Sequence, residues 1–317
     1  MKMPLTVAPE HGFGSFIFSE LVTDLDALKA DIAFIGIPHG SPYSMRDVTN
    51  GQSQAPNAIR QVSERTVRSL ERFDFDLGGT LFDGQDIRMV DCGNVPGNMH
   101  DFSEHVARSQ AAVEKILEAG ALPLIIGGDH AIPIPVLRAY KDRGPITLIQ
   151  IDAHIDWRQE VNGVTEGLSS TMRRASEMPH VDQIFQIGIR SQGSANPEDV
   201  EAAHAYGAKL ITAYELHDVG MRAILDRIPD GGNYYLTIDA DGLDPAVMPA
   251  VAGPAPGGVT FIQARELIHG LVRKGRVVGM DVVEILPGMD LNRISLITAA
   301  RLFVNMIGAT VRAGYYR

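Results

Sequence analysis

Two short acidic segments could carry metal chemistry, because each places carboxylates two residues apart directly after an apolar run. Residues 152–156 (DAHID) follow the run 146–151, and residues 239–241 (DAD) follow the run 234–238. Such runs are typical of buried β-strands, in which side chains at i and i+2 share a face. Buried carboxylates need a cationic partner, and four aspartates balance two divalent ions. The two segments therefore predict a site for two metal ions.

A third segment adds an imidazole to this set. The apolar run 122–126 ends in residues 127–130 (GGDH), where two glycines permit a tight turn. A carboxylate-rich set with two imidazoles suits Mn²⁺, with Ni²⁺ as the alternative. Two such ions can activate a shared water at neutral pH. The predicted ligands are His130, Asp152, His154, Asp156, Asp239 and Asp241.

The elements that must position these side chains alternate along the chain. Strands are expected at 31–37, 88–91, 122–126, 146–151, 183–189, 208–212, 234–238 and 277–283. Helices are expected at 101–119, 131–141, 199–206, 219–228, 260–273 and 292–308. This alternation predicts an α/β chain with a mainly parallel sheet and helices on both faces. Ligands of such sheets lie at the carboxyl ends of the strands, where the acidic segments fall.

Composition narrows the class of protein. The 317 residues are 45% hydrophobic and show no linker, so we expect one domain over residues 1–317. The net charge of −11 argues against nucleic-acid binding. A single cysteine, Cys92, and no signal peptide favour the cytoplasm. No apolar run suggests a membrane span.

The GGDH and DAHID segments, followed by residues 238–245 (IDADGLDP), resemble the ureohydrolases: arginase, agmatinase, guanidinobutyrase and relatives. The resemblance covers most of the chain, and the loop motifs look closest to the agmatinase branch. It implies a three-layer αβα fold with eight mainly parallel strands, assembled as a homotrimer or homohexamer. It also implies a small cationic guanidino substrate.

The resemblance further implies a role for each site residue. One ion matches the ligands His130, Asp152, Asp156 and Asp241, while Asp152 and Asp241 bridge to a second ion that His154 and Asp239 also hold. Glu284, in residues 281–284 (DVVE), matches the carboxylate that receives the guanidinium group. A hydroxide between the ions would attack the guanidinium carbon while Asp156 holds the proton, releasing urea and an amine.

The sequence departs from its relatives in loops that follow strands. Leu168 stands where relatives carry a proposed proton-shuttle histidine, and Glu166 could replace it or bind a substrate cation. Trp157 replaces the usual Thr or Ser, and its indole could stack on guanidinium or pack under the loop. Residues 46–54 lack the common Pro-Gly-Xaa-Arg pattern, and residues 250–254 replace a Gly-Thr-Gly-Thr-Pro stretch. These loops would build the pocket rim, so the departures affect the substrate more than the metal chemistry.

The sequence thus predicts an amidinohydrolase with agmatine as the default substrate, which would place it in polyamine biosynthesis. 4-Guanidinobutyrate, 3-guanidinopropionate, guanidine and substituted guanidines remain alternatives. If the substrate has an amine tail, Glu166 could bind it. If the substrate has a carboxylate tail, Arg46, Arg158 or Arg190 could bind it. A deacetylase with one zinc is a second class, opposed by the Asp-Xaa-Asp pair and Glu284. A non-catalytic subunit of such an enzyme is the third.

Overall fold

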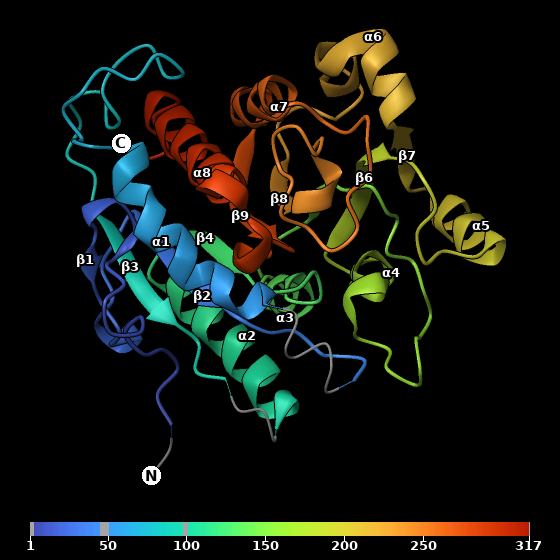
Figure 1. Cartoon of the computed structure of the whole chain (residues 1–317), viewed down its shortest axis with the longest axis horizontal. Helices are drawn as coiled ribbons and strands as arrows, with labels where there is room; N and C mark the ends of the chain where they lie inside the picture. Colours follow the sequence, from blue (N-terminus) through green and yellow to red (C-terminus); the bar gives the residue numbers. More distant parts are fainter. Residues whose placement is uncertain (1–2, 45–50, 98–100, 317) are drawn as a thin grey trace.

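The computed structural model describes residues 3–44, 51–97 and 101–316. Over these residues the strands form one nine-stranded sheet, in the order β1-β3-β2-β4-β9-β8-β5-β6-β7, and neighbouring strands run parallel. Figure 1 shows β1 and β7 toward opposite sides of the molecule. The strands are β1 (Glu20–Leu21), β2 (Ile32–Ile37), β3 (Met89–Asn94), β4 (Leu122–Gly127), β5 (Ile146–Ile151), β6 (Val181–Ile189), β7 (Lys209–Thr212), β8 (Asn233–Asp239) and β9 (Arg276–Val283).

All eight expected strands are confirmed, and each overlaps one of β2 to β9. The ninth strand, β1, pairs with β3 at the edge of the sheet and was not expected. Because it has only two residues, it carries no apolar run or alternation that a sequence pattern could reveal. The expectation of eight strands was therefore one too low.

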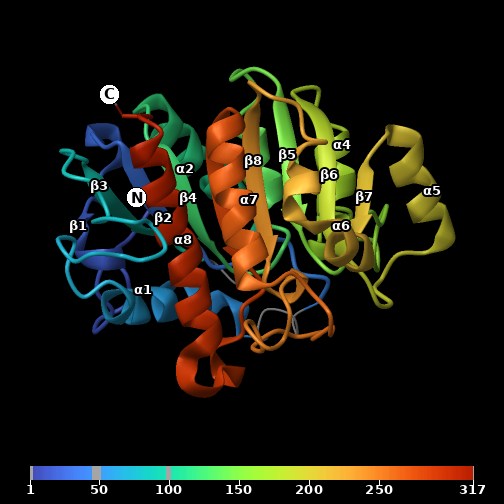
Figure 2. The same ribbon diagram turned by 90° about the horizontal axis from the view of Figure 1, so that it is seen from above.

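Helices cover both faces of the sheet (Figure 2): α1, α8, α7 and α6 lie on one face, and α2 and α4 lie on the other. The helices are α1 (Ala55–Thr66), α2 (Phe102–Glu118), α3 (Pro133–Arg138), α4 (Thr171–Ser176), α5 (Pro197–Tyr206), α6 (Ala213–Leu225), α7 (Phe261–Lys274) and α8 (Ile294–Arg312). Helices α1 and α4 were not expected. The first begins directly after the polar segment 46–54, and the second is too short to show a helical period.

The structure has two hydrophobic cores between the sheet and its helices. Because successive side chains of a strand point to opposite faces, alternate strand residues belong to different cores. In β4, Leu124 and Ile126 join one core while Ile125 joins the other. The segment Leu291–Arg312, which contains α8, is long and apolar enough to cross a membrane. Because 83% of its most apolar stretch is buried inside the protein, its composition is that of a core helix.

The strand order decides where the predicted site residues meet. Strands β4, β9, β8 and β5 are consecutive in the sheet. His130 follows β4, Glu284 follows β9, Asp239 ends β8 and Asp152 follows β5. Since the strands are parallel, all four residues lie at the same edge of the sheet.

Candidate active site

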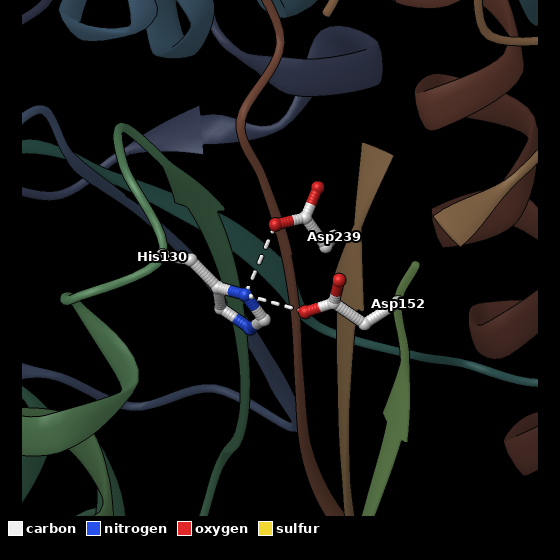
Figure 3. A group of neighbouring side chains, drawn as sticks. All are labelled: His130, Asp152 and Asp239. Carbon is white, nitrogen blue, oxygen red and sulfur yellow. Dashed lines mark ion pairs between the residues drawn. The ribbon is translucent and has the colours of Figure 1, made fainter. Parts of the chain in front are cut away.

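His130 lies at the centre of a buried group of carboxylates. Its Nδ1 atom is 3.1 Å from Asp152 Oδ2, 2.9 Å from Asp156 Oδ2 and 3.0 Å from Asp239 Oδ2. Figure 3 shows the imidazole pointing toward Asp152 and Asp239, which come from neighbouring strands. The side chain of His130 is only 1% exposed, so solvent does not screen these contacts.

A second group forms around His154. Its Nδ1 atom lies 3.2 Å from Asp241 Oδ2 and 3.5 Å from Asp152 Oδ1. Asp152 therefore turns one oxygen toward each imidazole. The ligand atoms of His130, Asp152 and Asp239 lie within 4.8 Å of one another, as do those of Asp152, His154 and Asp241. The structure thus presents two potential metal groups that share Asp152.

This grouping places Asp239 differently from the prediction. The resemblance made Asp241 a bridge between the two groups and placed Asp239 with His154, whereas in the structure Asp239 lies beside His130 and Asp241 lies beside His154. Asp239 is the last residue of β8, and from the end of this strand its side chain reaches His130. Asp241 belongs to the short 3-10 helix η6 (Ala240–Gly242), and this turn directs its side chain toward His154.

The other nitrogen of His130 fixes the tautomer of the ring. Thr237 Oγ1 donates its hydrogen to Asp281 Oδ1 at 2.6 Å, so it can only accept from His130 Nε2, which is 3.0 Å away. Tyr235 also donates to Asp281, at 2.7 Å. With its Nδ1 proton removed, as metal binding requires, His130 directs the lone pair of Nδ1 at three carboxylates. Only a cation satisfies four electron-rich groups in that arrangement, so the residues fit a divalent ion.

The pKa values show how strongly this crowding disfavours a set of free charges. Burial, together with the charge of Asp152, raises the pKa of Asp156 to about 7. Burial also raises the pKa of Asp239 well above its usual value, with Asp241 and Asp152 adding to the effect. Hydrogen bonds to Asp152 and Asp241 raise the pKa of His154 to about 12. Without metal, protons therefore take the place of the missing positive charge.

Glu284 lies beside this centre and is held at several points. The backbone N–H of His130 donates to its Oε1 at 2.7 Å, and Gln52 Nε2 donates to its Oε2 at 2.9 Å. The Glu284 backbone has a positive φ of 64°, and its N–H donates to Gly128 O at 2.9 Å. Burial and the charge of Asp129 raise the pKa of the Glu284 carboxyl to about 7. A cation that approached this carboxylate would relieve its unfavourable burial.

Comparison with known proteins identifies the chain. The profile of the arginase family matches residues 30–308. The chain belongs to the arginase family. It is 33% identical over 290 residues to the guanidinobutyrase of Pseudomonas aeruginosa, covering 90% of this chain and 87% of that protein. It is 32% identical to the agmatinase of Edwardsiella ictaluri, covering 94% of this chain and 95% of that protein.

Among solved structures, this arginase-family chain is similar to the proclavaminate amidino hydrolase of Streptomyces clavuligerus. The TM-score is 0.82 at 26% identity, covering 98% of this chain and 100% of that chain. The fold and the ureohydrolase resemblance are thereby confirmed. Since relatives with different substrates match at similar identity, the comparisons do not single out the agmatinase branch.

The structure pairs Glu166 with a cation. Both oxygens of its carboxylate accept from Arg138 of α3, at 2.6 and 3.1 Å. About a third of each side chain is exposed. The carboxylate is paired with a cation in this geometry, and a role of Glu166 in catalysis stays a prediction.

Trp157 also differs from its predicted role. The residue is 1% exposed and belongs to one hydrophobic core, where its ring lies 5.7 Å from that of Tyr206. An indole enclosed by core residues cannot stack on a substrate that enters from solvent. The alternative interpretation, packing under the loop, is the correct one.

Arg190 is also used by the fold. Its buried guanidinium donates to the backbone oxygens of Gly188, Asp241, Gly242, Leu243 and Ala255. These bonds hold the loop that carries Asp241, so Arg190 is not available to bind a carboxylate tail. Arg158 bonds Ser194 O at 3.1 Å and lies 3.6 Å from Asp199. Arg46, the third candidate, lies outside the described residues.

Sequence reasoning missed four residues that contact the site or its rim: Gln52, Thr237 and Asp281, described above, and Tyr43. The Tyr43 hydroxyl accepts from the N–H of Ser169 at 2.8 Å, in the loop where the shuttle histidine was expected. A side chain at Gly167 would collide with the Tyr43 ring, so the loop packs closely on this residue. Tyr43 could have been considered, because it lies between the predicted strand 31–37 and the predicted rim segment 46–54.

Proposed function

We propose that this arginase-family protein hydrolyses a guanidino compound to urea and an amine, using two divalent ions held by the six predicted ligands. The observation that carries the proposal is the meeting of two His/Asp groups on the shared Asp152, beside a buried Glu284. Mn²⁺ is the proposed metal, with Ni²⁺ as the alternative. When bound, the ions would supply a water activated at neutral pH.

The protein side chains have separate tasks in this proposal. Glu284 accepts charge-assisted hydrogen bonds from the planar guanidinium group and orients it. Asp156, whose carboxylate lies 2.9 Å from His130 within the ligand set, holds a proton while the amine departs in this proposal. Both residues are largely excluded from water, with exposures of 7% for Glu284 and 6% for Asp156. Exclusion of water strengthens the electrostatic contribution of each.

Agmatine is the proposed default substrate, and the guanidinium group is what it shares with the alternatives. Glu166 is paired with Arg138, and Arg190 is bonded to backbone oxygens, so neither residue selects the charge of the substrate tail. The substrate is therefore to be identified by comparing guanidino compounds that carry an amine tail, a carboxylate tail or no tail. We further propose a homotrimer or homohexamer in the cytoplasm, which analytical ultracentrifugation and cell fractionation would test.

The test is to load the purified protein with Mn²⁺, and separately with Ni²⁺, and to measure urea release. The panel contains agmatine, 4-guanidinobutyrate, 3-guanidinopropionate and guanidine. We expect urea from at least one compound and none from an Asp239→Ala variant, which loses a predicted ligand. A protein that binds two ions but releases urea from no member of the panel would remove the proposed activity. Full turnover by Asp239→Ala would show that the ligands are misassigned.

A further inference from the structure

Gln52 is a buried amide that reaches the carboxylate of Glu284 from a distant part of the chain. It is 4% exposed, and its Nε2 donates to Glu284 Oε2 at 2.9 Å. The backbone N–H of His130 donates to the other oxygen, Oε1, at 2.7 Å. The carboxylate is thus held at both oxygens by donors that belong to different segments.

Local backbone geometry brings Gln52 to this position. Gly51 has a φ of 96°, a left-handed conformation that glycine adopts without strain. It precedes the 3-10 helix η4 (Gln52–Gln54), which leads directly into α1. Within η4, Gln54 is exposed while Gln52 points inward. This stretch belongs to residues 46–54, where the sequence departs from the common ureohydrolase pattern.

Glu284 is also anchored through its backbone. Its left-handed φ of 64° places the residue just beyond β9, and its N–H donates to Gly128 O at 2.9 Å. With the backbone fixed, the main freedom left to the carboxyl group is rotation about its last side-chain bonds. The bond from Gln52 opposes that rotation.

We propose that Gln52 is a positioning residue that fixes the plane of the Glu284 carboxylate and thereby the plane in which a guanidinium group binds. A planar guanidinium pairs with a carboxylate through parallel hydrogen bonds, so the two planes are coupled. Turning the carboxylate would turn the guanidinium and misplace the carbon that water attacks. Because the amide is neutral, it orients Glu284 without cancelling the charge that attracts the substrate. This inference rests on the proposed function of Glu284.

The test replaces Gln52 by methionine, which keeps the length of the side chain and removes the donor. Gln54→Met is the matched control, since it changes an exposed residue of the same short helix. Urea release gives kcat and KM, and isothermal titration calorimetry gives the Kd of guanidinium and of Mn²⁺. Loss of one hydrogen bond to a charged group corresponds to about a ten- to hundredfold effect.

For Gln52→Met we expect kcat/KM to fall about ten- to hundredfold and guanidinium binding to weaken, with Mn²⁺ affinity unchanged. Gln54→Met should match the wild type in every measurement. A Gln52→Asn variant, which draws the amide back by one methylene, should show the same direction of change and serves if Gln52→Met does not fold. Unchanged kcat/KM and guanidinium Kd in both Gln52 variants would overturn the inference. If the wild type releases no urea, the proposed function fails, and the guanidinium Kd values still decide the role of Gln52.

Discussion

Replacing Thr237 by valine should weaken metal binding, because Thr237 connects the predicted ligand His130 to the buried Asp281. Its Oγ1 accepts from His130 Nε2 at 3.0 Å and donates to Asp281 Oδ1 at 2.6 Å. Valine has almost the same shape, so the change removes two hydrogen bonds and leaves packing intact. Without the acceptor, Nε2–H loses its partner and the imidazole no longer has a fixed orientation or tautomer.

Thr237→Val should lower the metal affinity about ten- to hundredfold. This is the usual loss when a metal-binding histidine loses the hydrogen-bond partner of its other ring nitrogen. That range corresponds to about 1.4–2.7 kcal/mol. Stability should also fall, by about 1.5–3 kcal/mol, because Asp281 loses a donor while fully buried. Calorimetric titration with Mn²⁺, with competition by a chelator for tight sites, measures the first quantity. Urea-induced unfolding of the metal-free protein measures the second.

Tyr235→Phe is the matched control for this prediction. The Tyr235 hydroxyl donates to the same Asp281 carboxylate at 2.7 Å but does not contact His130. Its loss should lower the free energy of unfolding to a similar extent while changing metal affinity far less. If Thr237→Val binds Mn²⁺ as tightly as the wild type, or if Tyr235→Phe weakens binding equally, Thr237 does not orient the ligand.

Three further predictions concern the rim, the core and pH. Glu166→Gln should leave the rate of urea release unchanged and alter stability by less than about 1 kcal/mol, because the lost contact is a partly exposed ion pair with Arg138; a slowed rate would restore Glu166 to the catalytic set. Trp157→Ala should lower the free energy of unfolding by about 3–5 kcal/mol, whereas Trp157→Phe should leave KM unchanged; a raised KM in Trp157→Phe would indicate substrate contact. In the metal-free protein the free energy of unfolding should fall between about pH 5 and about pH 8. The reason is that the pKa values of Asp156 and Glu284, both raised to about 7 from 3.8 and 4.5, let the folded state keep protons that the unfolded chain has lost. Stability that is flat or rises over that range in urea unfolding curves would contradict those shifts.

Much of the site could be predicted from the sequence because strand geometry is periodic. Apolar runs that end in acidic residues indicated β4, β5 and β8, and the parallel order brought their ends together as expected. The same i, i+2 rule, applied backward from Asp239, would have indicated Thr237 and Tyr235 on the same face of β8.

What could not be predicted depends on local turns and long-range contacts. The turn of η6 places Asp239 in the group of His130 and Asp241 in the group of His154, and no spacing rule reveals that arrangement. The bond from Gln52 to Glu284 joins residues 232 positions apart, in a segment without a regular pattern. Trp157 was ambiguous because an indole after a strand end can face either the pocket or the core.

The central claim is that His130 and His154 belong to two metal sites that share Asp152. A crystal grown with Mn²⁺ and measured at the manganese absorption edge tests this most directly. We predict two anomalous peaks about 3.5–4 Å apart, one beside each histidine, with Asp152 between them. A single peak, or peaks away from these residues, would contradict the account.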